Sequence, residues 1–187
     1  TLHYHAKRFF APVALAARIL DGKLQLRAVN DHHAEVRLGV RIRTLDLLGS
    51  LLGERIAEAH LPPDRAVDVV AIDAPRADDR FYVIDALVDG VADPSLQVVV
   101  FPDLPKRIDL PVATIAVAAA GEGRFTLSSD APAFFVRPEA AAHPGHFDDA
   151  SFLLLPGEPR TVTFKPEAGV AMPDVEDIAV QHLAETW

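Results

Sequence analysis

Apolar and polar residues alternate in short runs along most of the chain, and this period of two is typical of half-buried strands. The clearest run covers residues 36–43, where four aliphatic residues alternate with positions that include Arg37, Arg41 and Arg43. Antiparallel sheets with one face on a core and one in water have this pattern. We therefore predict a strand here, buried on one side and wet on the other.

Six more runs of this kind precede residue 102. Turn signals separate several of them, including Asp21-Gly22, Leu48-Gly49-Ser50 and Pro62-Pro63-Asp64, and residues 30–33 are predicted to be a loop. About seven strands at short spacing are expected of an immunoglobulin-like sandwich. The six runs are 13–19, 24–28, 51–60, 67–72, 81–88 and 96–101.

Prolines 102, 105 and 111 interrupt the pattern, and proline cannot donate to a sheet ladder. We interpret this segment as a connector, after which the pattern restarts as a second, smaller sandwich. Residues 138–149 are predicted to be a loop. The strands expected in this unit are 115–119, 125–127, 133–137, 152–155, 161–165 and 178–182.

The stretch from Ser151 to Lys165 predicts a hairpin. Residues 152–155 are an apolar run, Pro156-Gly157 is a turn signal, and Val162 and Phe164 share one face of a second strand. A two-stranded hairpin is not stable alone in water. It is therefore expected to close a sheet formed by earlier strands.

Leu2, Ala6, Phe9 and Phe10 form a helical stripe that ends before Pro12. Two interpretations stay open at this point. The helix packs on its own domain, or it is the last helix of a missing domain. The chain starts at Thr1 with no signal-like segment, so it is expected to be part of a longer protein.

Composition narrows the class of protein. Half of the 187 residues are hydrophobic, which allows a substantial core, and the net charge is −9. That charge disfavours nucleic acid and anionic membranes as partners. No run is long and apolar enough to span a bilayer. With no cysteine, disulfides and thiolate metal sites are excluded.

Adjacent acids occur at Asp78-Asp79 and Asp148-Asp149. Glycoside hydrolysis uses two carboxyl groups about 5–10 Å apart across a sugar site. Neighbouring residues on a strand point to opposite faces, and neighbours on a loop usually meet water. Neither pair is therefore assigned a catalytic role, and no catalytic, cofactor or metal residue is predicted.

Histidines and aromatic residues supply the remaining candidates. His143, His146 and Asp148 form a cluster of metal-ligand types, but Pro-Gly between the histidines makes its geometry loose. His32-His33 is a weaker cluster, and His3 and His5 diverge on the predicted helix. A sugar platform would need exposed aromatic rings, for which the candidates are Tyr4, Tyr82, Phe134, Phe135 and Trp187.

Residues 148–164 and 2–13 together carry a family resemblance. The first stretch reads Asp-Asp-Ala-Ser-Phe-Leu-Leu-Leu-Pro-Gly-Glu-Pro-Arg-Thr-Val-Thr-Phe. It resembles the last β-sandwich domain of β-mannosidases of glycoside hydrolase family 2, although Ala150-Ser151 and Leu153 depart from the usual hairpin. The second reads Leu-His-Tyr-His-Ala-Lys-Arg-Phe-Phe-Ala-Pro-Val. It resembles the junction between the catalytic barrel and an immunoglobulin-like domain.

The resemblance implies an all-β chain of two tandem immunoglobulin-like sandwiches after a helical remnant of a missing catalytic barrel. The predicted bounds are 1–10 for the remnant, 11–102 and 109–187 for the sandwiches, and 103–108 for the linker. Both catalytic glutamates of the family lie upstream, on the barrel, so this part would be non-catalytic and would support the barrel. The parent would hydrolyse terminal β-D-mannosides with retention. The alternatives are a carbohydrate-binding module and a pair of protein-interaction domains.

Overall fold

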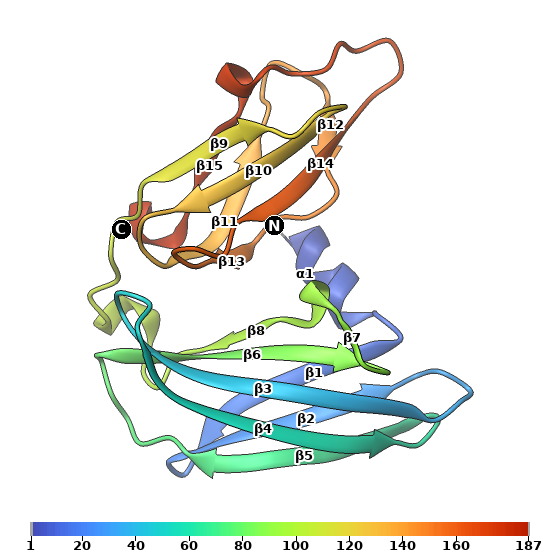
Figure 1. The fold of residues 1–187 in the computed structure, drawn as a ribbon, viewed down its shortest axis with the longest axis vertical. Coiled ribbons are helices and arrows are strands. Elements are labelled where there is room, and N and C mark those ends of the chain that lie inside the picture. The colour runs from blue at the N-terminus through green and yellow to red at the C-terminus, as the bar shows by residue number, and fades with distance from the viewer. Residues whose placement is uncertain (1, 187) are drawn as a thin grey trace. The chain divides into compact units, whose positions relative to one another are not determined.

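The computed structural model describes residues 2–186, apart from the side chains of Leu2, His3 and His5. It contains two compact units, one formed by His5–Asp109 and the other by Thr1–Tyr4 with Leu110–Trp187. A single short α-helix, α1 (Leu2–Phe9), precedes strands that account for most of the described chain (Figure 1). The predicted all-β fold class is confirmed.

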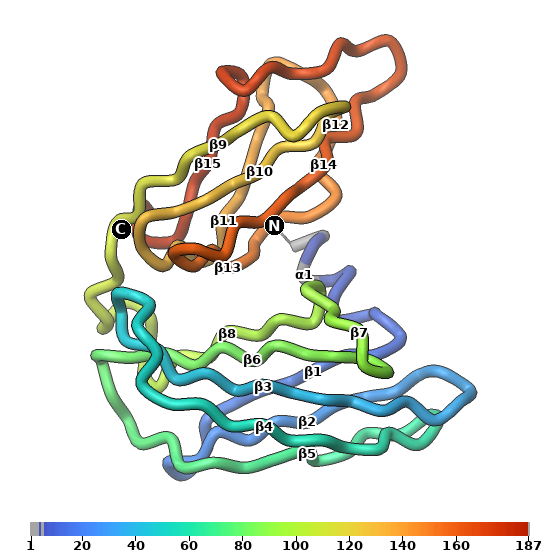
Figure 2. The backbone as a smooth tube through the Cα atoms, viewed as in Figure 1, coloured from blue at the N-terminus to red at the C-terminus, as the bar shows by residue number. Residues whose placement is uncertain are grey.

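The unit formed by His5–Asp109 is a sandwich of two antiparallel sheets (Figures 1 and 2). One sheet has the order β1-β2-β5, and the other has the order β4-β3-β6, with β7 and β8 both paired to the free side of β6. The strands are β1 (Val13–Leu20), β2 (Lys23–Asn30), β3 (Val36–Asp46), β4 (Leu51–Leu61), β5 (Arg65–Asp73), β6 (Arg80–Val88), β7 (Val91–Ala92) and β8 (Val98–Val100), with the 3-10 turn η1 (Pro94–Leu96) before β8.

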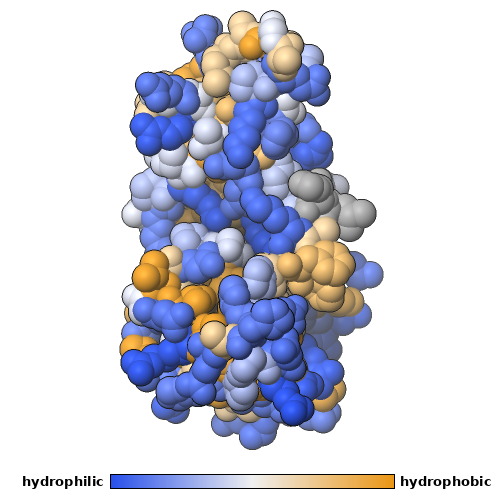
Figure 3. All heavy atoms as spheres, turned by 90° about the vertical axis from the view of Figure 1, so that its right-hand side faces the viewer, coloured by the Kyte–Doolittle hydropathy of each residue, from blue (hydrophilic) through white to orange (hydrophobic). Residues whose placement is uncertain are grey.

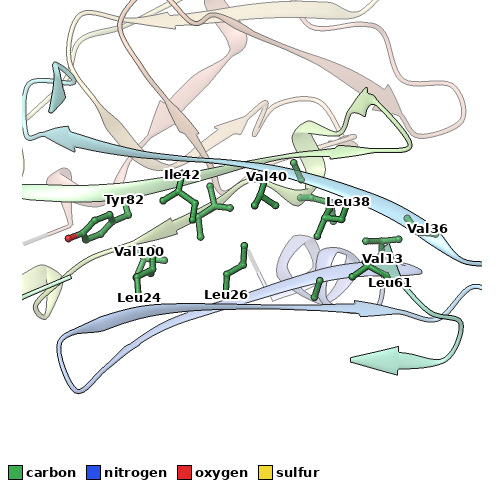
Figure 4. Close-up of a cluster of buried hydrophobic side chains, with 14 of the residues drawn as sticks. Val13, Leu24, Leu26, Val36, Leu38, Val40, Ile42, Leu61, Tyr82 and Val100 are labelled. Atoms are coloured by element: carbon green, nitrogen blue, oxygen red, sulfur yellow. The ribbon is translucent and has the colours of Figure 1, made fainter. Parts of the chain in front are cut away.

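The core of this unit lies between the two sheets. Val36, Leu38, Val40 and Ile42 point from β3 towards the opposite sheet, where Leu24 and Leu26 of β2 face them (Figure 4). Each of these side chains is at most 5% exposed. Burying one large aliphatic side chain contributes about 1.5–3 kcal/mol. The alternation in the sequence therefore corresponds to strand residues that point in turn into the core and away from it.

Two polar residues correct the sequence prediction in this unit. Asn30 was expected in a loop, but it is the fully buried last residue of β2. Its side-chain amide donates to the carbonyl oxygens of Ala34 and Leu61, both at 2.9 Å. Arg43 was expected on a wet face, but it is 6% exposed, and its Nη2 lies 2.9 Å from Asp85 Oδ2. In both cases polar contacts between strands make burial of the polar group tolerable.

The second unit is a smaller sandwich. One sheet has the order β12-β14-β10-β9 and the other β13-β11-β15. Phe125, Leu127 and Val162 from the first sheet and Val136 and Leu154 from the second belong to one buried cluster. The strands are β9 (Ile115–Ala119), β10 (Arg124–Ser129), β11 (Ala133–Glu139), β12 (Gly145–Phe147), β13 (Phe152–Leu154), β14 (Arg160–Pro166) and β15 (Ala179–Gln181), and the short 3-10 turns are η3 (Val175–Asp177) and η4 (Leu183–Glu185). The 3-10 turn η2 (Pro105–Arg107) belongs to the first unit.

The predicted hairpin is wrong in its pairing. Both strands exist, but β13 pairs with β11 while β14 pairs with β10 and β12. Only an isolated bridge between Leu155 and Glu158 links the two arms. All four residues from Phe152 to Leu155 are buried, so this arm lacks the wet face that a hairpin on a surface would have. The Pro156-Gly157 turn thus carries the chain from one sheet to the other.

The predicted loop 138–149 is also corrected. Pro138 still belongs to β11, and residues 145–147 form β12, which pairs with β14. The short strand is hidden in the sequence because Gly145 and His146 carry no apolar pattern. Phe147 shows its role, since its ring is 3% exposed and lies 5.2 Å from the ring of Phe164, centroid to centroid.

Candidate functional site

The carboxylates of Asp148 and Asp149 accept hydrogen bonds from residues of β14. Asp148 Oδ1 accepts a hydrogen bond of 2.8 Å from the backbone N–H of Thr163. Asp149 Oδ2 accepts one of 2.6 Å from Arg160 Nη2, and the Arg160 guanidinium lies 4.7 Å from the centroid of the Phe152 ring. Both carboxylates are engaged in contacts that hold secondary structure. The pair therefore has a structural role in the second unit.

The other acidic pair lies on the exposed approach to β6. Asp79 accepts two hydrogen bonds from Arg80, at 2.6 and 2.9 Å. The hydrogen bond from Arg80 lowers the pKa of the Asp79 carboxyl. A lowered pKa keeps this group ionised and unsuited to donating a proton near neutral pH.

The histidine cluster does not assemble. His143 Nδ1 lies 3.0 Å from the carbonyl oxygen of Ala171, and its Nε2 lies 3.1 Å from Asp177 Oδ2, so both ring nitrogens face protein acceptors. His146 is exposed on β12. Among the side chains that the structure describes, no three of histidine, aspartate or glutamate are grouped closely enough to hold a metal ion.

The weaker histidine candidates give no site either. His33 is almost fully exposed, and its Nδ1 is 3.9 Å from Asp64 Oδ2. His32 is exposed beside it. The side chains of His3 and His5 lie outside the described residues.

The aromatic candidates do not form an exposed platform. Tyr82 and Phe134 are 3% and 1% exposed, and Tyr82 belongs to the core of its sandwich. Phe135 is 38% exposed and has a φ of 53°, at an irregularity in the pairing of β11 with β13. Trp187 lies outside the described residues.

Tyr4 is held by its hydroxyl group. The Tyr4 hydroxyl donates a 2.7 Å hydrogen bond to the carbonyl oxygen of Phe147. Partial burial raises the pKa of Tyr4, and the nearby carboxylates of Asp149 and Asp148 raise it further. A ring fixed in this way is a packing element of its unit.

A feature that the sequence prediction missed is a hollow on the outer face of the sheet formed by β4, β3 and β6. Outward-facing residues of three neighbouring strands form a lattice of three rows, and Gly39 occupies its centre. Because the central position has no side chain, its neighbours line a depression of about 670 Å³, and every member of the lattice except Asp85 contributes to that lining. The rows are His60, Arg37 and Asp89; Glu58, Gly39 and Leu87; Ile56, Arg41 and Asp85.

The hollow combines apolar and polar groups. Leu87 and Ile56 are 38% and 72% exposed, which leaves apolar surface open beside Gly39. Figure 3 shows apolar patches between hydrophilic side chains in its lower half, which holds the N-terminal sandwich.

Two polar side chains of the hollow are available to a ligand. Neither the Arg37 guanidinium nor the Glu58 carboxylate has a hydrogen-bond partner in the part of the chain that the structure describes. By contrast, His60 Nδ1 is 3.1 Å from Glu35 Oε1, and Arg41 Nη2 is 3.2 Å from Asp85 Oδ2. The hollow therefore offers one free donor group and one free acceptor group beside the exposed apolar surface of Leu87 and Ile56.

One signal in the sequence points to this hollow. Gly39 interrupts the aliphatic-arginine alternation of residues 36–43 in the middle of the clearest strand. A glycine inside a strand often marks a place where another group approaches the backbone closely. The neighbours that complete the lattice come from β4 and β6, and their register is not visible in a single sequence.

Comparison with known proteins bears on the second unit first. Residues 108–186 match the family model Ig_mannosidase, which describes an Ig-fold domain. The resemblance to a β-mannosidase sandwich, noted in residues 148–164, is thereby confirmed. No curated protein sequence matches the chain.

Solved structures extend the similarity in fold to both units. A β-D-mannosidase from Dictyoglomus thermophilum matches 96% of the chain, with a TM-score of 0.78 and 19% identity. An exo-chitosanase from Amycolatopsis orientalis matches 89%, with a TM-score of 0.61 and 18% identity. The chain covers 22% and 25% of these two proteins. It therefore has the fold of about a fifth to a quarter of each.

Proposed function

We propose that this chain is the non-catalytic, immunoglobulin-like C-terminal part of a family 2 glycoside hydrolase. The observation that carries the proposal is the Ig_mannosidase match over residues 108–186. The fold shared with a β-D-mannosidase over 96% of the chain supports it. The parent enzyme would hydrolyse terminal β-D-mannosidic bonds with retention, using two glutamates located outside this chain.

The contacts of the acidic residues are consistent with a non-catalytic role. Retaining glycosidases need an acid/base and a nucleophile about 5–5.5 Å apart on either side of the scissile bond. Asp149 is paired with Arg160, Asp148 with the backbone of Thr163, and Asp79 with Arg80. Each of these carboxylates is thus engaged by a neighbouring group of the chain.

The proposed role is mechanical support of the catalytic barrel in the same parent chain, with sandwiches at 11–102 and 109–187. Exposed apolar side chains fit such a role. Phe9 and Phe10 are 76% and 79% exposed, with their rings packed edge to face at 5.3 Å. Apolar groups gathered at an exposed position are frequent in surfaces that bind another protein domain.

Two assays test this function. The purified 187-residue chain is incubated with an aryl β-mannoside and is expected to show no turnover above the buffer blank. The full-length parent is expected to hydrolyse the same substrate with retention at the anomeric carbon. Turnover by the chain that survives repurification would contradict the non-catalytic role. A parent that prefers an aryl β-glucosaminide would contradict the mannoside assignment and leave the structural role intact.

A further inference from the structure

We infer that the hollow centred on Gly39 is a binding site for one sugar ring of a glycan chain, separate from any catalytic centre. The choice of a sugar as ligand rests on the proposed function, since a glycosidase meets glycans as substrates. The position of the site rests on the structure of the N-terminal sandwich alone.

The size and shape of the hollow suit a small ligand. Its volume is about 670 Å³, inside the range of roughly 300–1,000 Å³ usual for small-molecule sites. Its floor is backbone at Gly39, and its walls are side chains from β4 on one side and β6 on the other. Strands of one sheet hold these walls at fixed spacing, so the site needs no rearrangement to form.

The lining matches the two kinds of surface that a pyranose presents. Such a ring has apolar C–H faces and a rim of hydroxyl groups that donate and accept hydrogen bonds. Leu87 and Ile56 supply apolar surface beside Gly39. Arg37 offers only donors and Glu58 only acceptors, and neither is engaged by a described residue. A hydroxyl group can satisfy both.

The charges around the hollow point to a neutral ligand. Charges of both signs line the hollow, since Arg37 and Arg41 lie among the carboxylates of Glu35, Glu58 and Asp89. A strongly charged ligand of either sign would meet like charges there, at an energetic cost. A ring of hydroxyl groups meets no such repulsion.

The identity of residue 39 is not explained by the backbone. Gly39 has none of the positive φ values that favour glycine elsewhere in the chain. A Cβ atom at this position would lie 3.7 Å from Leu87 Cβ, an ordinary van der Waals contact. Strand interiors favour β-branched and aromatic residues over glycine. What glycine provides here is the open space above the strand.

The test is a titration of the 15N-labelled 187-residue chain with β-1,4-mannobiose, followed by amide chemical shifts. Saturable shifts are expected at residues 37–41, 56–60 and 87–90. Gly39→Leu fills the hollow and should weaken binding at least tenfold. Gly53→Ala is the matched control, because Gly53 lies on β4 of the same sheet with open space around its Cβ position. It should bind as the wild type does.

Further variants and probes keep the result decisive. Arg37→Ala and Glu58→Gln change exposed side chains without steric demand, and each should weaken binding at least threefold. Mannitol, an open-chain polyol, should give no saturable shifts. Absence of saturable shifts with mannobiose, equal binding of mannitol, or unchanged binding by all three hollow variants would overturn the inference. None of these outcomes bears on the aryl mannoside assays, which test the proposed function independently.

Discussion

Asp85 holds together the polar contacts on the outer face of β3 and β6. Its Oδ2 atom lies 2.9 Å from Arg43 Nη2 and 3.2 Å from Arg41 Nη2, and its Oδ1 accepts from Gln97 Nε2 at 2.9 Å. The Arg43 side chain is 8% exposed and that of Asp85 is 22% exposed. The charge of Arg43 is therefore buried in contact with a carboxylate.

Asp85→Ala is expected to lower the free energy of unfolding by roughly 3 kcal/mol, since breaking a buried ion pair by removing one partner is strongly destabilising. Urea denaturation followed by fluorescence measures the change. Glu54→Gln is the control, because Glu54 is an exposed partner of Arg41 at 3.9 Å and such pairs contribute about 0–1 kcal/mol. Equal losses of unfolding free energy in the two variants would mean that the Asp85 contacts stabilise the fold no more than an exposed ion pair does.

His182 is a buried imidazole without a hydrogen-bond partner. It is 3% exposed, and neither ring nitrogen is bonded to any atom of the described chain. Replacing a buried polar group that lacks partners by an apolar group of similar volume is nearly neutral or stabilising. His182→Leu should therefore keep the melting temperature or raise it, while His182→Ala should cost about 2–4 kcal/mol through the cavity it leaves. A large loss with leucine would reveal a polar contact made in solution.

Several aspartates give the fold a pH dependence of predictable sign. Backbone hydrogen bonds lower the pKa of Asp46, Asp103 and Asp130, with the bond from Ser50, Leu104 and Thr114, respectively, as the largest cause. A carboxyl group whose pKa is lower in the folded state stabilises the fold above its unfolded value, about 3.9, and loses that effect as the pH falls through the folded value. Melting temperatures should thus fall below about pH 4. Asp46→Asn and Asp130→Asn together should flatten that decline, and an unchanged slope would contradict the assignment.

At the scale of elements, alternation in the sequence predicts strands well where one face is buried and one is wet. β1, β2, β3 and β10 were all predicted in this way and are confirmed. The prediction of strand pairing fails where apolar and polar residues do not alternate. β13 is buried on both faces and joins the sheet opposite β14, and which sheet a strand joins depends on partners distant in the sequence.

The position of β12 depends on the close approach of the Gly145 backbone to β14. A Cβ atom on Gly145 would lie 2.5 Å from Phe164 Cζ and 2.6 Å from the carbonyl oxygen of Lys165. Gly145→Ala must therefore displace β14 or the Phe164 ring, and overpacking of this kind costs about 1–3 kcal/mol. Thermal unfolding measures the loss, with Gly53→Ala as a control expected to lie within about 0.5 kcal/mol of wild type. Equal stability of both variants would show that β12 can move without cost.

At the scale of the whole chain, the sequence predicted two sandwiches, because local patterning suffices for that. The hollow at Gly39 was beyond its reach. Its lining comes from three strands whose register is set by pairing between residues distant in the sequence, as in the pairs of Gly39 with Glu58 and with Leu87. The residues that looked most chemical, Asp148-Asp149 and His143, are instead tied to backbone and charged groups nearby.

The last prediction concerns the exposed pair Phe9 and Phe10 at the end of α1. Side chains that are 76% and 79% exposed contribute little to the stability of the sandwich, so Phe9→Ser with Phe10→Ser should change the free energy of unfolding by less than about 0.5 kcal/mol. If the pair contacts the barrel of the parent, the same double variant should lower the melting temperature of the full-length enzyme by several degrees. Differential scanning calorimetry of both lengths separates the two effects. A loss of several kcal/mol in the 187-residue chain would place the pair in the core of its own sandwich, and an unaffected parent would remove these residues from the barrel contact.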